Sequence, residues 1–278
     1  MKRLLTIELQ KLWSNRASRI LVLTYFILLT FIALLSSVNF SFLGMDFRLA
    51  DMGIFNFPYI WHLNTWIASL LKFFLAVVIV SMMANEYTYG TLKQNLIDGL
   101  SKKEFIASKF ITVTLFAAIS TVFIFILTLV LGYSFSSYTE LSIVTTDLIY
   151  LLAYFLKLVA FFAFCLYIGI LIKRSAFAIG FVFVWWIAEG IMKGVLWKIF
   201  KDMDLVNRIL GFFPLEAMSN LIKEPITRIQ AYKAIEAQVS GKEELKFYGV
   251  HWYEIVIVLA WIAIFVYLSY RTLKKRDL

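Results

Sequence analysis

The sequence predicts an all-α, polytopic membrane protein with six transmembrane helices. Hydrophobic residues make up 62% of the 278-residue chain and charged residues only 16%, whereas soluble domains are roughly 45–50% apolar and about 25% charged. A water-soluble fold could not hide that much apolar surface from water. We therefore expect one transmembrane domain over residues 1–278.

Six apolar segments approach the length of about 20 residues that a helix needs to cross a hydrocarbon core of about 30 Å. These segments are residues 20–38, 66–84, 110–131, 148–172, 176–196 and 255–270. The last segment is the shortest, but Trp252 and Tyr253 precede it and Tyr267 and Tyr270 close it. Aromatic residues are typical of the two membrane interfaces, so we count this segment as a sixth span.

The orientation follows from the basic residues, because cytoplasmic connections retain Lys and Arg. These residues concentrate at both ends of the chain and after the second and fourth spans: Lys2, Arg3, Lys11, Arg16, Arg19, Lys93, Lys102, Lys103, Lys109, Lys173, Arg174, Arg271, Lys274, Lys275 and Arg276. The other short connections, 39–61 and 132–147, hold only Arg48. We expect a cytoplasmic (inner) membrane location with both termini in the cytoplasm and the long segment 200–252 outside.

Two segments outside the spans have amphipathic patterns. In residues 1–19, Leu5, Leu9 and Leu12 share one helical face among basic and polar residues, which predicts a helix at the inner membrane surface; a flexible charged tail is the alternative. In the extracytoplasmic segment 200–252, apolar residues recur at helical spacing and predict short outer helices. The residues of that pattern are Ile226, Ile229, Tyr232, Ile235 and Val239.

Several kinds of chemistry are missing from the sequence. No phosphate-binding G-x-x-x-x-G-K-[ST] loop, H-E-x-x-H motif or G-x-S-x-G motif occurs. His62 and His251 are expected near the outer surface as interfacial residues, and Cys165 lies in an apolar run. We therefore expect no catalytic residue, metal site or cofactor in this chain. The basic residues are explained by the orientation of the chain in the membrane, so we expect no nucleic-acid partner.

The connection between the second and third spans is the most informative segment. Gly90 and Gly99 mark breaks around a short helix predicted at 91–98, and Ser101 with Glu104 predicts a capping box at the start of the next helix. The short helix carries an apolar ridge of Leu92, Leu96 and Ile97. Such a helix at a membrane surface is suited to docking in a groove of a soluble partner. The alternative is a loop helix packed on its own bundle.

This connection resembles the membrane subunit of ABC-2 type ABC transporters, in which the second span ends in an E-x-x-x-G-T signature. Glu86, Gly90 and Thr91 match that signature, and the resemblance continues through Ser101-Lys102 and Lys109. The resemblance implies that residues 85–109 form a coupling segment on an ATPase subunit. Its coupling residues would be Glu86, Gly90, Thr91, Leu92, Lys93, Leu96, Ile97 and Asp98.

The same resemblance implies the partners and the activity. The chain would be a permease subunit that forms a translocation path for export with a second copy or a homologous permease. A separate cytoplasmic ATP-binding subunit would bind ATP and Mg²⁺. At the membrane edge, we expect Glu86 to pair with Lys93 or with that partner.

Other functions remain open on the sequence. A secondary transporter or channel acting alone would favour midplane carboxylates or helices broken by Gly and Pro, but Pro58, Pro214 and Pro225 lie outside the predicted spans. A membrane enzyme acting on lipids would need paired carboxylates at the inner surface. An anchor subunit of a motility or envelope complex is the remaining alternative.

Four ionisable residues fall inside the predicted spans, where charge is costly: Lys72, Lys157, Glu189 and Lys193. Because Glu189 and Lys193 are four residues apart, we expect them to form an ion pair. The lysines lie towards the outer half of their spans, and snorkelling to the head groups would explain them. The alternative is a cationic outer vestibule for an anionic or amphipathic substrate.

Overall fold

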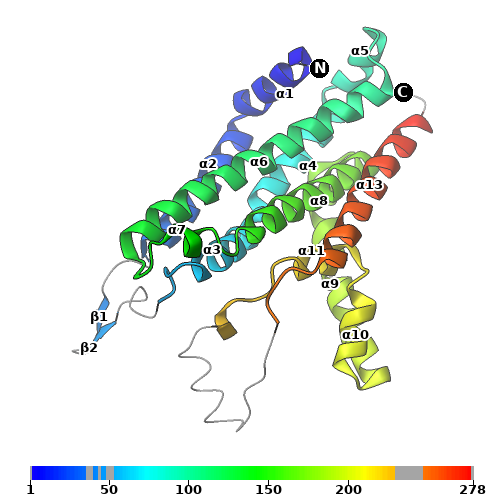
Figure 1. The fold of residues 1–278 in the computed structure, drawn as a ribbon. Coiled ribbons are helices and arrows are strands. Elements are labelled where there is room, and N and C mark those ends of the chain that lie inside the picture. Colours follow the sequence, from blue (N-terminus) through cyan, green and yellow to red (C-terminus); the bar gives the residue numbers. More distant parts are fainter. Residues whose placement is uncertain (1, 36–39, 43–44, 48–52, 229–246, 277–278) are drawn as a thin grey trace.

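The chain folds almost entirely into helices (Figure 1). The computed structural model describes residues 2–35, 40–42, 45–47, 53–228 and 247–276. Within them the elements are α1 (Lys2–Ser14), α2 (Arg16–Leu35), β1 (Phe40–Phe42), β2 (Met45–Phe47), α3 (Tyr59–Leu70), α4 (Lys72–Thr88), α5 (Thr91–Ile97), α6 (Lys102–Phe135), α7 (Leu141–Val144), α8 (Ile149–Ile172), α9 (Ser175–Phe200), α10 (Met203–Leu210), α11 (Pro214–Asn220) and α13 (Trp252–Lys274). The predicted all-α class is confirmed, and the only β structure in the described residues is the antiparallel ribbon β1–β2.

The described helices supply six candidate membrane crossings when one bent pair is counted as a single span. Five helices are long and apolar enough to cross alone: α2, α6, α8 with the turn α7 before it, α9 and α13. Helices α3 and α4 meet this test together and are bent by 43° at their junction, so the predicted span 66–84 is a broken helix rather than a continuous one. Both termini lie at the same end of the bundle, beside α5 (Figure 1). An even number of crossings follows, and α3–α4 therefore counts as one span.

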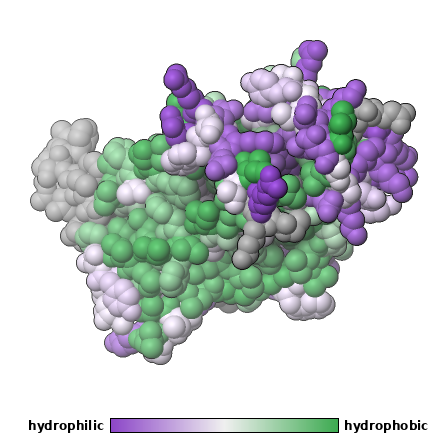
Figure 2. Space-filling view, turned by 90° about the horizontal axis from the view of Figure 1, so that it is seen from above, coloured by the Kyte–Doolittle hydropathy of each residue, from purple (hydrophilic) through white to green (hydrophobic). Residues whose placement is uncertain are grey.

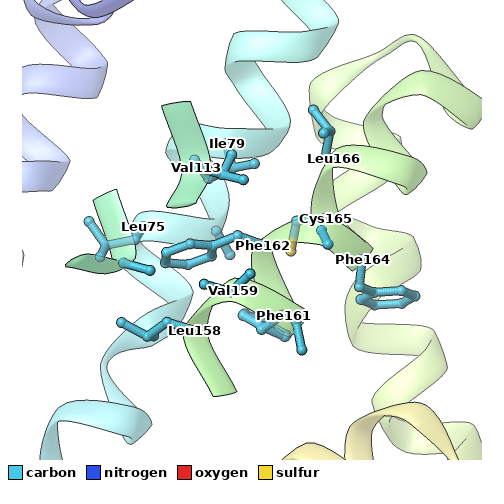
Figure 3. Close-up of a cluster of buried hydrophobic side chains, with 14 of the residues drawn as sticks. Leu75, Ile79, Val113, Leu158, Val159, Phe161, Phe162, Phe164, Cys165 and Leu166 are labelled. Carbon is cyan, nitrogen blue, oxygen red and sulfur yellow. The ribbon is translucent and has the colours of Figure 1, made fainter. Parts of the chain in front are cut away.

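Helix α8 forms the centre of the bundle. It contacts α3, α4, α6, α9, α11 and α13, and 72% of its spanning window is buried, against 17–28% in the other four helices. Figure 3 shows Phe162 and Cys165 of α8 among Leu75 and Ile79 of α4 and Val113 of α6. A helix that is apolar on every side belongs in the core of a bundle, and α8 occupies that position.

The outer helices cover α8 and expose apolar side chains on their other faces. On α9, for example, Phe183, Trp186 and Ile191 are exposed. Figure 2 shows a broad hydrophobic surface beside a region where hydrophilic side chains gather. A surface of this kind is stable only against lipid or against another apolar protein surface, which agrees with a multi-pass membrane protein.

The segment between the fifth and sixth spans contains short helices, as predicted. Helices α10 and α11 lie there, followed by a 3-10 turn at Ile226–Arg228. The remainder of the amphipathic helix predicted at 226–239 lies outside the described residues. His62 is fully buried rather than interfacial, because its ring stacks on Tyr150 and its Nε2 atom lies 2.9 Å from the Lys223 carbonyl oxygen.

The close approach of α4 and α8 depends on Gly169. A Cβ atom at this position would lie 2.9 Å from the Met83 Cβ atom, which is too close for the helices to remain in place. We predict that Gly169→Ala destabilises the purified protein by about 1–3 kcal/mol through overpacking. The matched control is Gly180→Ala on α9, which has open space around it and should stabilise the helix slightly. Thermal unfolding followed by tryptophan fluorescence compares the two; equal midpoints would contradict this account of the α4–α8 contact.

Candidate functional site

The predicted short helix between the second and third spans is present as α5. Gly90 and Gly99 flank it with φ angles of +68° and +95°, values that glycine adopts without the steric cost of a Cβ atom. The predicted capping box is confirmed: the Ser101 hydroxyl oxygen accepts from the Glu104 N–H at 3.1 Å, and a Glu104 carboxylate oxygen accepts from the Ser101 N–H at 3.0 Å. The glycines and the cap thus define where α5 ends and α6 begins.

The two faces of α5 have different environments. Leu92 is only 1% exposed and Leu96 packs against the same core, so most of the predicted apolar ridge faces the protein's own bundle. The outward face instead carries Lys93 and Ile97, which are four residues apart, and Tyr89 lies just before the helix, between the end of α4 and Gly90. Tyr89 is 74% exposed and Ile97 73% exposed. Of the predicted ridge, only Ile97 is available to a partner.

A cluster of buried charges lies directly behind α5. The ammonium group of Lys109 on α6, which is 0% exposed, donates to Glu8 of α1 at 2.5 Å and to Glu86 of α4 at 2.6 Å. Lys11 donates to the same Glu86 oxygen at 2.9 Å, and the Thr91 hydroxyl of α5 donates to the other Glu86 oxygen at 2.6 Å. We call this set of five residues the Lys109 network.

The Lys109 network is balanced in charge, since two ammonium groups face two carboxylates. Burial of Lys11 lowers its pKa, but the hydrogen bonds and charges of Glu86 and Glu8 outweigh burial and raise the pKa above its ordinary value. The Lys11 ammonium therefore contributes stability that persists through neutral pH and is lost only as the pH rises through this raised pKa.

The network corrects one sequence expectation and adds a residue that sequence reasoning missed. Glu86 was expected to pair with Lys93 or with the partner subunit, but its ion pairs within the described structure are with Lys109 and Lys11. Glu8 was not singled out at all. The signal was present, because Glu8 is the first acidic residue of the chain and stands four residues before Leu12 on the apolar stripe. An isolated carboxylate on such a stripe indicates a buried partner of opposite charge.

The end of α13 is held to the same region. Lys102 donates to the Arg276 carbonyl oxygen at 2.8 Å. Arg276 donates to the Ile170 carbonyl oxygen, to the Leu171 carbonyl oxygen at 2.9 Å, and to the Tyr87 hydroxyl at 3.2 Å. The last carbonyl groups of a helix lack intrahelical donors, so Arg276 satisfies those of α8 while it contacts α4.

The intramembrane charges that the sequence singled out lie around one cavity. Lys72, Lys157, Glu189 and Lys193 all line a cavity of about 670 Å³ bordered by α3, α4, α8, α9 and α11. We call it the lysine cavity. The bend between α3 and α4 lies beside it, since Lys72 is the first residue of α4. Tertiary folding therefore gathers onto one surface charges that come from three different spans.

Glu189 and Lys193 do not pair with each other, contrary to expectation. Glu189 accepts hydrogen bonds from the Trp185 indole N–H at 2.7 Å and from the backbone N–H groups of Leu215 and Glu216 at 3.2 and 2.9 Å. Lys193 instead pairs with the Glu216 carboxylate at 2.8 Å. Both residues therefore fasten α9 to the N-terminus of α11, where free backbone N–H groups favour a carboxylate.

The other two lysines also have protein surroundings. Lys157 is only 3% exposed and lines the lysine cavity. The Lys72 ammonium lies 4.6 Å from the centre of the Phe161 ring, within the range of a cation–π interaction.

These features define a multi-pass helical membrane protein with a short helix exposed at one end and a charged cavity within the bundle. A sequence model described as ABC-2 family transporter protein matches residues 6–278. The chain therefore belongs to the ABC-2 transporter family, whose members are membrane permease components of ABC transporters. No curated protein gives a significant match to the chain.

The Lys109 network makes a prediction for stability. Lys109→Met leaves two buried carboxylates facing only Lys11, and we expect the protein to lose about 3–5 kcal/mol because a buried charge without its partner is costly. The double variant Glu8→Gln/Lys109→Met leaves Lys11 facing Glu86 alone, which is one cation for one anion. This variant should recover part of the stability lost in Lys109→Met. The control is Lys103→Met, which removes an exposed lysine six residues earlier on the same helix. Thermal unfolding measures all three; equal midpoints for the two single variants would refute a stabilising role of the network.

Proposed function

We propose that the chain is the permease subunit of an ABC-2 type exporter that forms a translocation path with a second permease copy and is driven by a separate ATP-binding subunit. The observation that carries this proposal is the hydrogen bond from Thr91 to Glu86 within the Lys109 network. Through it, the exposed helix α5 is tied to α4, α6 and α1 by charged contacts rather than by a flexible loop. Displacement of α5 by a partner would move the spans behind it.

We propose that the chain lies in the inner (cytoplasmic) membrane. In this orientation, the end of the bundle that carries α5 faces the cytoplasm. Support comes from Lys and Arg, which concentrate on α1, on the α4–α6 connection and after α13, as the positive-inside rule expects. Helix α6 has 34 residues, or about 51 Å at 1.5 Å per residue, and therefore extends beyond a hydrocarbon core of about 30 Å. Its first turns, with Lys109, can lie outside the hydrocarbon.

The surface proposed for the ATP-binding subunit is the outward face of α5. Lys93 and Ile97 offer a cationic and an aliphatic contact on this face, and the exposed ring of Tyr89 lies just before the helix. A short helix that presents spaced side chains fits a groove on a soluble partner. ATP and Mg²⁺ would be bound by that partner, and the direction of export is the one that the family resemblance implies.

A second permease copy is supported by the surface of α9. This helix is the least buried of the five complete spans, and the lysine cavity is bordered by its exposed residues Trp186 and Ile187. A neighbouring copy placed against this face would close the cavity from the side and convert it into part of a shared path.

Photocrosslinking tests the partner. A photoactivatable amino acid at Ile97 should form a crosslink in cells to a protein that contains a G-x-x-x-x-G-K-[ST] loop, as identified by mass spectrometry. The control position is Ile126 on α6, which is comparably exposed but lies in the middle of a membrane span. If crosslinks at Ile97 contained no nucleotide-binding protein, an ATP-driven function would be rejected.

A second experiment tests coupling itself. Once the ATP-binding subunit is co-purified, Glu86→Gln should reduce the ATPase activity that the permease stimulates by about tenfold, equivalent to about 1.4 kcal/mol, because the anchor of Thr91 is weakened. Glu104→Gln is the control, since this exposed carboxylate caps α6 without contacting α5. Unchanged stimulation in the Glu86 variant would show that the network is only structural.

A further inference from the structure

Lys157 is a buried cation for which the described residues supply no counter-charge. It lies on α8, is 3% exposed and lines the lysine cavity. Among the residues that the structure describes, no carboxylate forms an ion pair with its ammonium group and no acceptor receives a hydrogen bond from it. Burying an unpaired ammonium costs several kcal/mol, and ionisable residues inside membrane spans usually face a water-filled path or a ligand.

Lys72 adds a second positive charge to the same wall. Its side chain and that of Lys157 line the same cavity, and its ammonium group lies 4.6 Å from the centre of the Phe161 ring and 5.8 Å from that of Phe73. The carboxylates of the cavity are already engaged, because Glu216 pairs with Lys193 and Glu189 accepts three hydrogen bonds. Within the described part of the chain, two cations therefore face the cavity without a carboxylate paired to them.

The rest of the lining is apolar and aromatic. Trp66, Phe73, Phe161, Phe183 and Trp186 form much of the wall. Trp186 is 59% exposed, so the cavity opens on the outward surface of α9, which faces lipid or a second copy. Its volume of about 670 Å³ falls within the range of roughly 300–1,000 Å³ that is typical of small-molecule sites.

We propose that the lysine cavity binds an amphipathic anion, with a phosphate head group held between Lys72 and Lys157 and an apolar chain against the aromatic wall. A phosphate monoester carries about −1.5 to −2 charges at pH 7, which matches two ammonium groups. The binding of this anion depends only on the cavity. Its assignment as transported cargo rests on the proposed function.

Binding is tested on the full chain in phosphatidylcholine nanodiscs. Three probes separate the parts of the proposal: dodecyl phosphate, dodecylphosphocholine with the same chain but no net charge, and inorganic phosphate without a chain. Dodecyl phosphate should bind most tightly, as measured by microscale thermophoresis. Equal affinity for dodecylphosphocholine would overturn the role of charge, and equal affinity for inorganic phosphate would overturn the role of the chain.

Variants assign the site. Lys157→Met and Lys72→Met should each weaken dodecyl phosphate binding by about tenfold or more, whereas Lys198→Met, which removes an exposed lysine of α9, should leave it unchanged. Binding that survives both cavity variants would overturn the proposal. Retention of phosphatidic acid from mixed nanodiscs by the wild type, but not by Lys157→Met, would identify the bilayer as the source of the anion; binding of dodecyl phosphate alone would identify a water-soluble source.

Stability without ligand provides an independent measurement. Because Lys157 has no counter-charge, Lys157→Met should unfold at the same temperature as the wild type or higher, and dodecyl phosphate should no longer raise that temperature. A Lys157→Met protein that is less stable than the wild type would overturn the assignment of Lys157 as an unpaired ligand group. The assay needs no ATP-binding subunit, so its failure and a failure to crosslink a nucleotide-binding protein at Ile97 are separate results.

Discussion

The buried attraction between Lys109 and the two carboxylates of Glu8 and Glu86 is the constraint on which the α5 end of the protein depends. These residues come from three helices that are far apart in the sequence, and the ammonium group lies within 2.6 Å of both partners. Because an unpaired charge at a buried position is costly, each helix is held in the register that brings its charge to the centre. The position of α5 follows, since Thr91 binds the remaining oxygen of Glu86.

Much of this architecture could be predicted from local sequence. The spans follow from hydrophobicity, which acts over one segment at a time, and the ends of α5 follow from Gly90, Gly99 and the Ser101 cap, which act over a few residues. The family resemblance likewise rested on a short motif, and a model of that family matches residues 6–278. Features of this kind need no knowledge of tertiary contacts.

The pairing of charges could not be predicted in the same way. Sequence spacing favoured Glu189 with Lys193, because residues four apart on a helix can meet, and Lys93 was a candidate partner of Glu86 because it lies nearby in the same connection. Tertiary neighbours offered stronger partners: the free N–H groups at the start of α11 for Glu189, and Lys109 from another span for Glu86. The bend between α3 and α4 was equally hidden, since neither proline nor glycine occurs in the predicted span 66–84.

Helix α4 connects the Lys109 network to the lysine cavity. Glu86 lies in its last turn within the Lys109 network, and Lys72 is its first residue at the wall of the lysine cavity. These positions are 14 residues apart, or about 21 Å along a helix that rises 1.5 Å per residue. In the proposed function, α4 moves as one unit about the 43° bend at Leu71 that separates it from α3. In the proposed function, a partner that displaces α5 would therefore tilt α4 and change the distance between Lys72 and Lys157, which stands on the central helix α8. The energy of ATP hydrolysis would then reach the anion site as a change in the spacing of two ammonium groups.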